Sequence, residues 1–126
     1  MDKFGRHLCR LVVLGVFAGA AWADQGPVSG RDVFERHRRA CHGGPARADS
    51  PIGPSLVGIV GRKAGAGGSG VHSRAMLESG IAWDRERLRR FVSAPASEVS
   101  YTLMPPPGSL EPAEVESLLD YLQSLS

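Results

Sequence analysis

Cysteine and aromatic residues are scarce in this chain. Only two cysteines, Cys9 and Cys41, occur among 126 residues, which excludes a fold held together by several disulfides. The lack of a strict sequence repeat excludes collagen and coiled coils. Aromatic residues make up 6% of the chain, and a small domain buries a low fraction of its surface. Side chains alone therefore supply little core, and we expect another component to fill part of the interior.

The hydrophobic run near the N-terminus is too short to span a bilayer comfortably. Residues 11–20 form a ten-residue apolar run, and small residues follow at Ala21 and Ala23. Three basic residues precede the run: Lys3, Arg6 and Arg10. This pattern is typical of a secretory signal peptide. We expect residues 1–23 to be removed by cleavage after Ala23, residues 24–126 to form a single domain, and the mature protein to be periplasmic. The alternative is an uncleaved membrane anchor, which the short run disfavours.

An excess of one charge is also missing once that segment is removed. Residues 1–23 carry three of the fifteen Lys and Arg residues and one of the thirteen Asp and Glu residues. Residues 24–126 therefore have twelve basic and twelve acidic residues. Nucleic-acid binding needs a clustered basic excess and loses its main support. Cys41 then remains as a single cysteine in an oxidising compartment. We expect its thiol to be reactive, to form an intermolecular disulfide or to be used in another covalent bond.

Helix signals are confined to four segments. We expect helices over residues 30–39, 73–79, 85–93 and 112–125. The last segment has the i, i+3, i+4, i+7 spacing of an amphipathic helix. Residues 43–71 contain nine glycines and three prolines, and residues 95–108 are expected to be a loop interrupted by proline. The prediction is an all-α fold with long loops, and loops of this length in a compact domain are expected to wrap around something large.

Cys41 and His42 form the densest pair of groups able to bind a metal. In covalent haem attachment, a thiol adds to a vinyl group and the next residue presents a ring nitrogen to the iron. The usual motif is Cys-x-x-Cys-His. This chain has Arg38-Arg39-Ala40-Cys41-His42, so arginine replaces the first cysteine. Taken alone, the pair is a weak signal.

A larger set of positions strengthens the signal given by Cys41 and His42. They are Gly30, Phe34, Cys41-His42, Gly53-Pro54-Ser55-Leu56, Gly61-Arg62, Gly80-Ile81-Ala82-Trp83, Leu88, Pro95, Met104, Gly108 and Leu118-Leu119-Asp120-Tyr121-Leu122. In order and spacing, these residues resemble a class I cytochrome c of the mitochondrial and bacterial type. The resemblance covers residues 30–122 and implies a small class I cytochrome c fold, with three to four helices and long loops around one haem.

The resemblance also implies roles for individual residues. His42 and Met104, 62 positions apart, correspond to the two axial ligands of the iron. Pro54 would accept a hydrogen bond from the other ring nitrogen of His42 and so fix the orientation of the imidazole. Three further residues stand where such proteins place donors for a haem propionate: Arg62, Trp83 and Thr102. The second mature methionine, Met76, is expected to pack inward.

Arg38 is the main departure from the family pattern. An arginine cannot form a thioether, so the cofactor expected here is one haem c attached through Cys41 alone. Attachment by one cysteine occurs in the family, in some protist mitochondrial cytochromes. The stem of Arg38 could lie along the porphyrin edge while its guanidinium reaches water. The other arrangement, a buried unpaired charge, would be costly.

The function expected from these residues is one-electron transfer. With both axial positions filled, the iron has no open site for a small-molecule substrate, so we expect an electron carrier rather than an enzyme. Its partners would be redox proteins of the periplasm or of the membrane respiratory chain, and the protein would be a monomer. Two alternatives remain open: a pseudo-cytochrome that acts as a binding or assembly module without covalent haem, and a non-haem protein binding Cu(I) through Cys41, His42 and Met104.

Overall fold

A computed structural model of the chain describes residues 26–44, 50, 52–67 and 71–126. The predicted signal peptide, residues 1–23, lies outside the described residues. The helices are α1 (Gly30–His37), α2 (Arg39–His42), α3 (Arg74–Glu78), α4 (Arg85–Ser93), α5 (Pro95–Glu98) and α6 (Pro112–Ser124). The described ranges contain an isolated β-bridge, between Lys63 and Ala82, but no strand. The all-α prediction is confirmed.

The described residues include no helix long and apolar enough to cross a membrane.

Side chains just before α1 and α4 determine where these two helices begin. The hydroxyl of Ser29 accepts a hydrogen bond from the backbone N–H of Asp32, at 3.2 Å. The carboxylate of Asp84 accepts one from the N–H of Arg87, at 2.7 Å. Each bond satisfies one of the N–H groups that a helix leaves free at its first turn. Both caps agree with the predicted starts of these helices.

Helix α6 buries one face against the rest of the molecule. Pro112 occupies its first turn, where the missing N–H does no harm. Glu111 and Glu114 form a capping box, with each side chain accepting from the backbone N–H of the other residue. The buried side chains follow the predicted spacing: Val115, Leu118, Leu119 and Leu122. This face forms one wall of a single hydrophobic cluster that also includes residues of α1 and α4.

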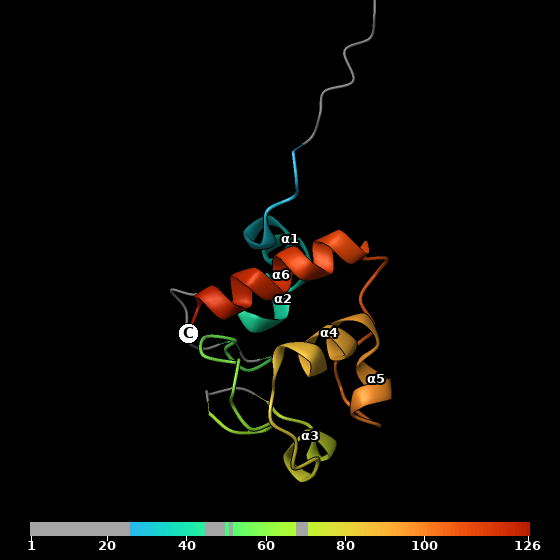
Figure 1. Ribbon diagram of the computed structural model, residues 1–126. Helices are drawn as coiled ribbons and strands as arrows, with labels where there is room; N and C mark the ends of the chain where they lie inside the picture. The colour runs from blue at the N-terminus through green and yellow to red at the C-terminus, as the bar shows by residue number, and fades with distance from the viewer. Residues whose placement is uncertain (1–25, 45–49, 51, 68–70) are drawn as a thin grey trace, which may run out of the picture.

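Helices α1 and α6 cross in close contact, which Figure 1 shows at one end of the molecule, opposite α3. A Cβ atom on Gly30 would lie 1.8 Å from the carbonyl oxygen of Ser117 and 2.8 Å from the Cβ of Tyr121. Only glycine therefore allows the two backbones to approach this closely. The rings of Phe34 and Tyr121 pack nearby, with centroids 5.5 Å apart.

The structure differs from the sequence prediction in two short helices. The first predicted helix is broken at Arg38, where φ is −123°, and the chain then turns into α2. The loop predicted over residues 95–108 begins instead with a helical turn, α5, and that part of the prediction is wrong. Pro95 occupies the first turn of α5, where its fixed φ favours a helical start.

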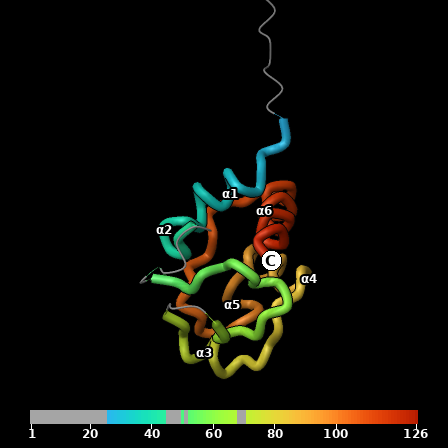
Figure 2. The backbone as a smooth tube through the Cα atoms, turned by 90° about the vertical axis from the view of Figure 1, so that its left-hand side faces the viewer, coloured from blue at the N-terminus to red at the C-terminus, as the bar shows by residue number. Residues whose placement is uncertain are grey.

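The segment between α2 and α3 is irregular where it is described, as its glycines predict. Figure 2 shows part of it as a green tube on the near side of the molecule. Backbone hydrogen bonds join it to residues before α4: Gly61 donates to the carbonyl of Trp83 at 2.6 Å, and Trp83 donates to that of Arg62 at 2.9 Å. These bonds hold Arg62 and Trp83 side by side.

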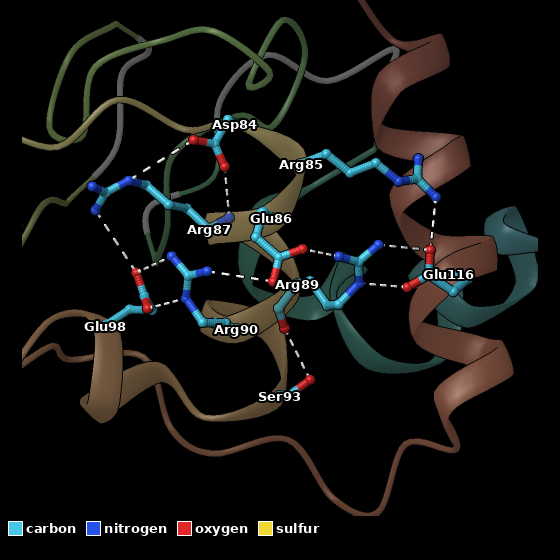
Figure 3. Close-up of polar contacts among 9 residues, drawn as sticks. All are labelled: Asp84, Arg85, Glu86, Arg87, Arg89, Arg90, Ser93, Glu98 and Glu116. Carbon is cyan, nitrogen blue, oxygen red and sulfur yellow. Dashed lines mark hydrogen bonds and ion pairs between the residues drawn. The ribbon is translucent and has the colours of Figure 1, made fainter.

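Ion pairs connect α4 with both neighbouring helices, as Figure 3 shows. Arg89 binds the carboxylate of Glu116 on α6 at 2.6 Å, Arg85 binds it at 2.9 Å, and Arg90 pairs with Glu98 on α5. Hydrogen bonds from Arg89 and Arg85 lower the pKa of Glu116 to about 2. The arginines of α4 are partly exposed and paired with carboxylates. They do not form a free basic patch.

Replacing Gly30 with alanine tests the helix crossing. Alanine usually favours a helix relative to glycine, but here the methyl group meets the backbone of α6. We expect Gly30→Ala to lower the free energy of unfolding by about 1–3 kcal/mol, the usual cost of overpacking, as measured by urea denaturation. Gly108→Ala is the control because an added Cβ there has no neighbour within 4 Å. Equal stability of both variants would contradict this account of the crossing.

Candidate haem site

All seven predicted site residues line one cavity. They are Cys41, His42, Pro54, Arg62, Trp83, Thr102 and Met104. The cavity has about 1060 Å³ free of protein atoms, a figure that includes its opening to solvent. Much of its wall is apolar, with side chains such as Leu56, Ile59, Leu118 and Leu122. The structure thus brings together residues that are up to 63 positions apart in the sequence.

The imidazole of His42 is held in one orientation. Its Nδ1 lies 2.8 Å from the carbonyl oxygen of Pro54. A carbonyl can only accept a hydrogen bond, so Nδ1 carries the proton and Nε2 keeps its lone pair in the neutral ring. Burial lowers the pKa of His42; the hydrogen bond to Pro54 raises it, and the nearby charge of Arg38 lowers it further. The ring is therefore neutral at pH 7, with Nε2 available as a metal ligand.

Gly53 makes room for this ring. A Cβ atom at position 53 would lie 3.1 Å from both Cε1 and Nδ1 of His42 and 3.0 Å from the carbonyl oxygen of Cys41. The same carbonyl accepts a hydrogen bond of 2.6 Å from the hydroxyl of Ser50. The loop thus packs its backbone directly against α2. In the sequence, only the glycine before Pro54 marks this contact.

Met104 belongs to the loop between α5 and α6. Its backbone N–H donates to the hydroxyl oxygen of Thr102 at 3.3 Å, and three prolines follow it, at positions 105–107. These restrain the backbone that carries the thioether. Met76 is partly buried against the core, as predicted, and it lines the same cavity. The cavity therefore has two thioethers in its wall.

Two of the predicted propionate donors, Arg62 and Trp83, are held in place by neighbouring groups. Arg62 donates to the carbonyl oxygens of Ser55, at 2.6 Å, and Val57, at 3.1 Å, and burial lowers its pKa. Trp83 is buried, and its ring packs against Phe91 with centroids 4.8 Å apart. Arg62 has further N–H groups beyond those two bonds, so it can still donate to an anionic ligand.

Comparison with known proteins decides the family. The sequence matches no protein-family model. It is 34% identical over 96 residues to cytochrome c2 of Rhodoblastus acidophilus, covering 76% of this chain and 89% of that protein. It is 35% identical over 97 residues to cytochrome c of Tetrahymena pyriformis, covering 77% and 86%. The fold is similar to that of cytochrome cH from Methylobacterium extorquens, with a TM-score of 0.65, 34% identity and coverage of 75% and 94%.

The chain belongs to the class I cytochrome c family. Cytochromes of this class are monohaem electron carriers with a covalently bound haem c. The protein is accordingly an electron-transfer protein rather than an enzyme, and this function is favoured over the pseudo-cytochrome and copper-binding alternatives. The residues of the cavity fit such a group: a thiol stands next to a neutral imidazole with a free Nε2, and apolar side chains surround them.

The cytochrome departs from expectation at Arg38. Its side chain lines the cavity, and the residue is only 7% exposed, so most of the side chain is buried. Burial lowers the pKa of Arg38, and the neighbouring Cys41 raises it. The arrangement with an exposed guanidinium is therefore wrong, and the buried one is present. The sequence left both arrangements open because the length of an arginine side chain permits either.

Gly53→Ala tests how tightly the loop fits against His42. We expect the added methyl group to push the imidazole away from Pro54 and to lower the free energy of unfolding by at least about 1 kcal/mol. A crystal structure of the variant would show a longer distance from Nδ1 to the Pro54 carbonyl. Gly44→Ala is the matched control, because its Cβ meets nothing within 4 Å. An unchanged distance and stability in Gly53→Ala would show that the contact is looser than described.

Proposed function

We propose that this cytochrome is an exported, periplasmic one-electron carrier whose haem iron is bound by His42 and Met104. The observation that carries the proposal is the hydrogen bond from Nδ1 of His42 to Pro54, at 2.8 Å. It leaves Nε2 as the free ring nitrogen in a cavity that Met104 also lines. A histidine and a methionine as axial ligands are a combination used by electron-transfer haems.

The bound haem supplies an iron that alternates between the ferric and ferrous states. The chain's own residues hold it and limit what it can do. Pro54 keeps the ring of His42 in one tautomer and orientation. The thioether of Met104 favours the ferrous state and raises the reduction potential. With two side-chain ligands in place, no position is left for a substrate, and the apolar wall limits the access of water.

Three residues would hold the propionate groups of the haem: Arg62, Trp83 and Thr102. Arg62 is supported by its spare N–H groups and its fixed position between two backbone carbonyls. Trp83 is supported by its place in the cavity wall and by its indole N–H, which is a hydrogen-bond donor. The hydroxyl oxygen of Thr102 accepts from the N–H of Met104, and a hydroxyl that accepts in this way can also donate its own proton.

Attachment of the haem would use a single thioether. The Cys41 thiol would add across one vinyl group, with sulfur bonding to one carbon and the proton going to the other. Cys41 is the free cysteine among the described residues, and Arg38 occupies the place of the other attachment residue. The second vinyl group would remain unmodified.

The proposed location rests on the N-terminal sequence. Residues 1–23 have the charge pattern, apolar run and cleavage site of an exported protein. The protein would act as a monomer that exchanges electrons with redox proteins of the periplasm or of the membrane respiratory chain. Because the mature chain has no net charge, we expect no binding to nucleic acid and no strong dependence on a basic docking surface.

Met104→Ala tests the proposed ligation. We expect the variant to lose the ferric charge-transfer band that sulfur-ligated haem gives at the red end of the visible spectrum. We also expect a lower reduction potential and binding of exogenous ligands such as imidazole at the vacated position. Met76→Ala is the control, since Met76 also lines the cavity, and it should keep the native spectrum. Survival of the band in Met104→Ala, or its absence from the native protein, would refute Met104 as the ligand.

Cys41→Ser tests the attachment. The variant has no thiol in its mature part, so we expect acidified organic solvent to extract all of its haem, whereas the native protein should keep its haem in the protein fraction. Absorption spectra of the two fractions provide the measurement. Haem that stays with the denatured variant would show that another residue forms the covalent bond.

A further inference from the structure

Arg38 places a cation inside the cavity of this cytochrome, next to the segment that carries His42. We propose that the buried guanidinium of Arg38 raises the reduction potential of the haem iron by disfavouring the ferric state. The inference rests on the proposed function, because it assumes that iron is bound in this cavity. It gives a role to the residue that replaces the first attachment cysteine.

The backbone fixes where Arg38 lies. The residue ends α1, where its N–H donates to the carbonyl of Phe34 at 2.8 Å. It also begins α2, where its carbonyl accepts from the N–H of Cys41 at 3.1 Å and of His42 at 2.9 Å. The break between the two helices is therefore held from both sides. From this position the side chain reaches the same cavity as His42 and Met104.

The charge of Arg38 has little compensation. Its Nη2 makes a long contact of 3.4 Å with the carbonyl oxygen of Val92, near the C-terminal end of α4. Its Nε is buried and has no hydrogen-bond partner among the described residues. None of the ion pairs formed within the described part of the chain includes Arg38. By contrast, Arg89 and Arg90 of α4 each pair with carboxylates.

A buried cation with these properties acts on the oxidation state of a nearby iron. Oxidation adds one positive charge to the haem, and a fixed positive charge close to it makes that step less favourable. Buried charges interact more strongly than exposed ones because the interior has a lower dielectric constant than water. Salt also screens them less. The ferrous state, which carries one charge fewer, is therefore favoured when Arg38 is present.

Arg38→Gln tests the proposal in the intact holoprotein. Glutamine removes the charge but keeps a polar side chain with N–H donors. In a redox titration followed by absorption, we expect about a tenfold higher ferric-to-ferrous ratio at a fixed applied potential, which is about 59 mV for a one-electron couple. The shift should persist in high salt. Arg38→Lys, which keeps a positive charge, should remain within about threefold of the native ratio.

Arg39→Gln is the matched control. Arg39 is the next residue, but its side chain is 63% exposed and pairs with Glu35, so its removal should leave the potential unchanged. A native potential in Arg38→Gln, or equal shifts in the glutamine and lysine variants, would overturn the proposal. If Arg38→Gln does not retain haem, Arg38→Met provides the same comparison. Loss of haem from both neutral variants would also overturn it, because Arg38 would then serve assembly.

A second measurement separates charge from packing. Unfolding of the ferric and ferrous holoproteins by denaturant gives two equilibrium constants for each variant. A charge effect should change the ratio of these constants by the same tenfold factor, with Arg38→Gln stabilising the ferric form relative to the ferrous form. Lost packing would weaken both forms equally and leave the ratio unchanged, which would contradict the proposal. In Arg38→Gln, a native sulfur-ligation band together with an unchanged reduction potential would reject only the proposed role of Arg38. Absence of that band from the native protein would reject the proposed ligation by Met104.

Discussion

The hydrogen bond between Nδ1 of His42 and the carbonyl of Pro54 connects α2 to the irregular loop that follows it. It decides the tautomer of the imidazole and therefore leaves Nε2 as the nitrogen that would bind the iron. The bond depends on two further features of the chain. The break at Arg38 turns the chain into α2, and Gly53 lets the loop backbone approach the ring. Helices α3, α4 and α6 contribute further side chains to the wall of the cavity.

Much of the fold and the site could be predicted from local sequence signals. Ser29 and Asp84 cap helices where expected, and the apolar spacing of α6 matches its buried face. All seven predicted site residues line one cavity, because the order and spacing of a known family carried that information. The break at Arg38 and the burial of its side chain could not be predicted. The buried side chain reaches the carbonyl oxygen of Val92 on α4, which is distant in sequence and leaves no local pattern.

Charge is distributed in this molecule differently inside and outside the cavity. On the surface, the arginines of α4 are matched by carboxylates such as Glu116 and Glu98. Inside, Arg38 has only a backbone carbonyl as a polar partner among the described residues. The paired charges on α4 would offer a redox partner little net attraction, so recognition at this helix would use shape and local contacts more than long-range steering. The interior charge acts on the iron rather than on the partner.

The central claim is that one haem is attached to the mature chain through one cysteine. The intact mass of the native protein, measured after denaturation, tests it most directly. The account predicts a single species with the mass of residues 24–126 plus one haem. The bare mass of that polypeptide would show that haem is not covalently retained, and would contradict the account.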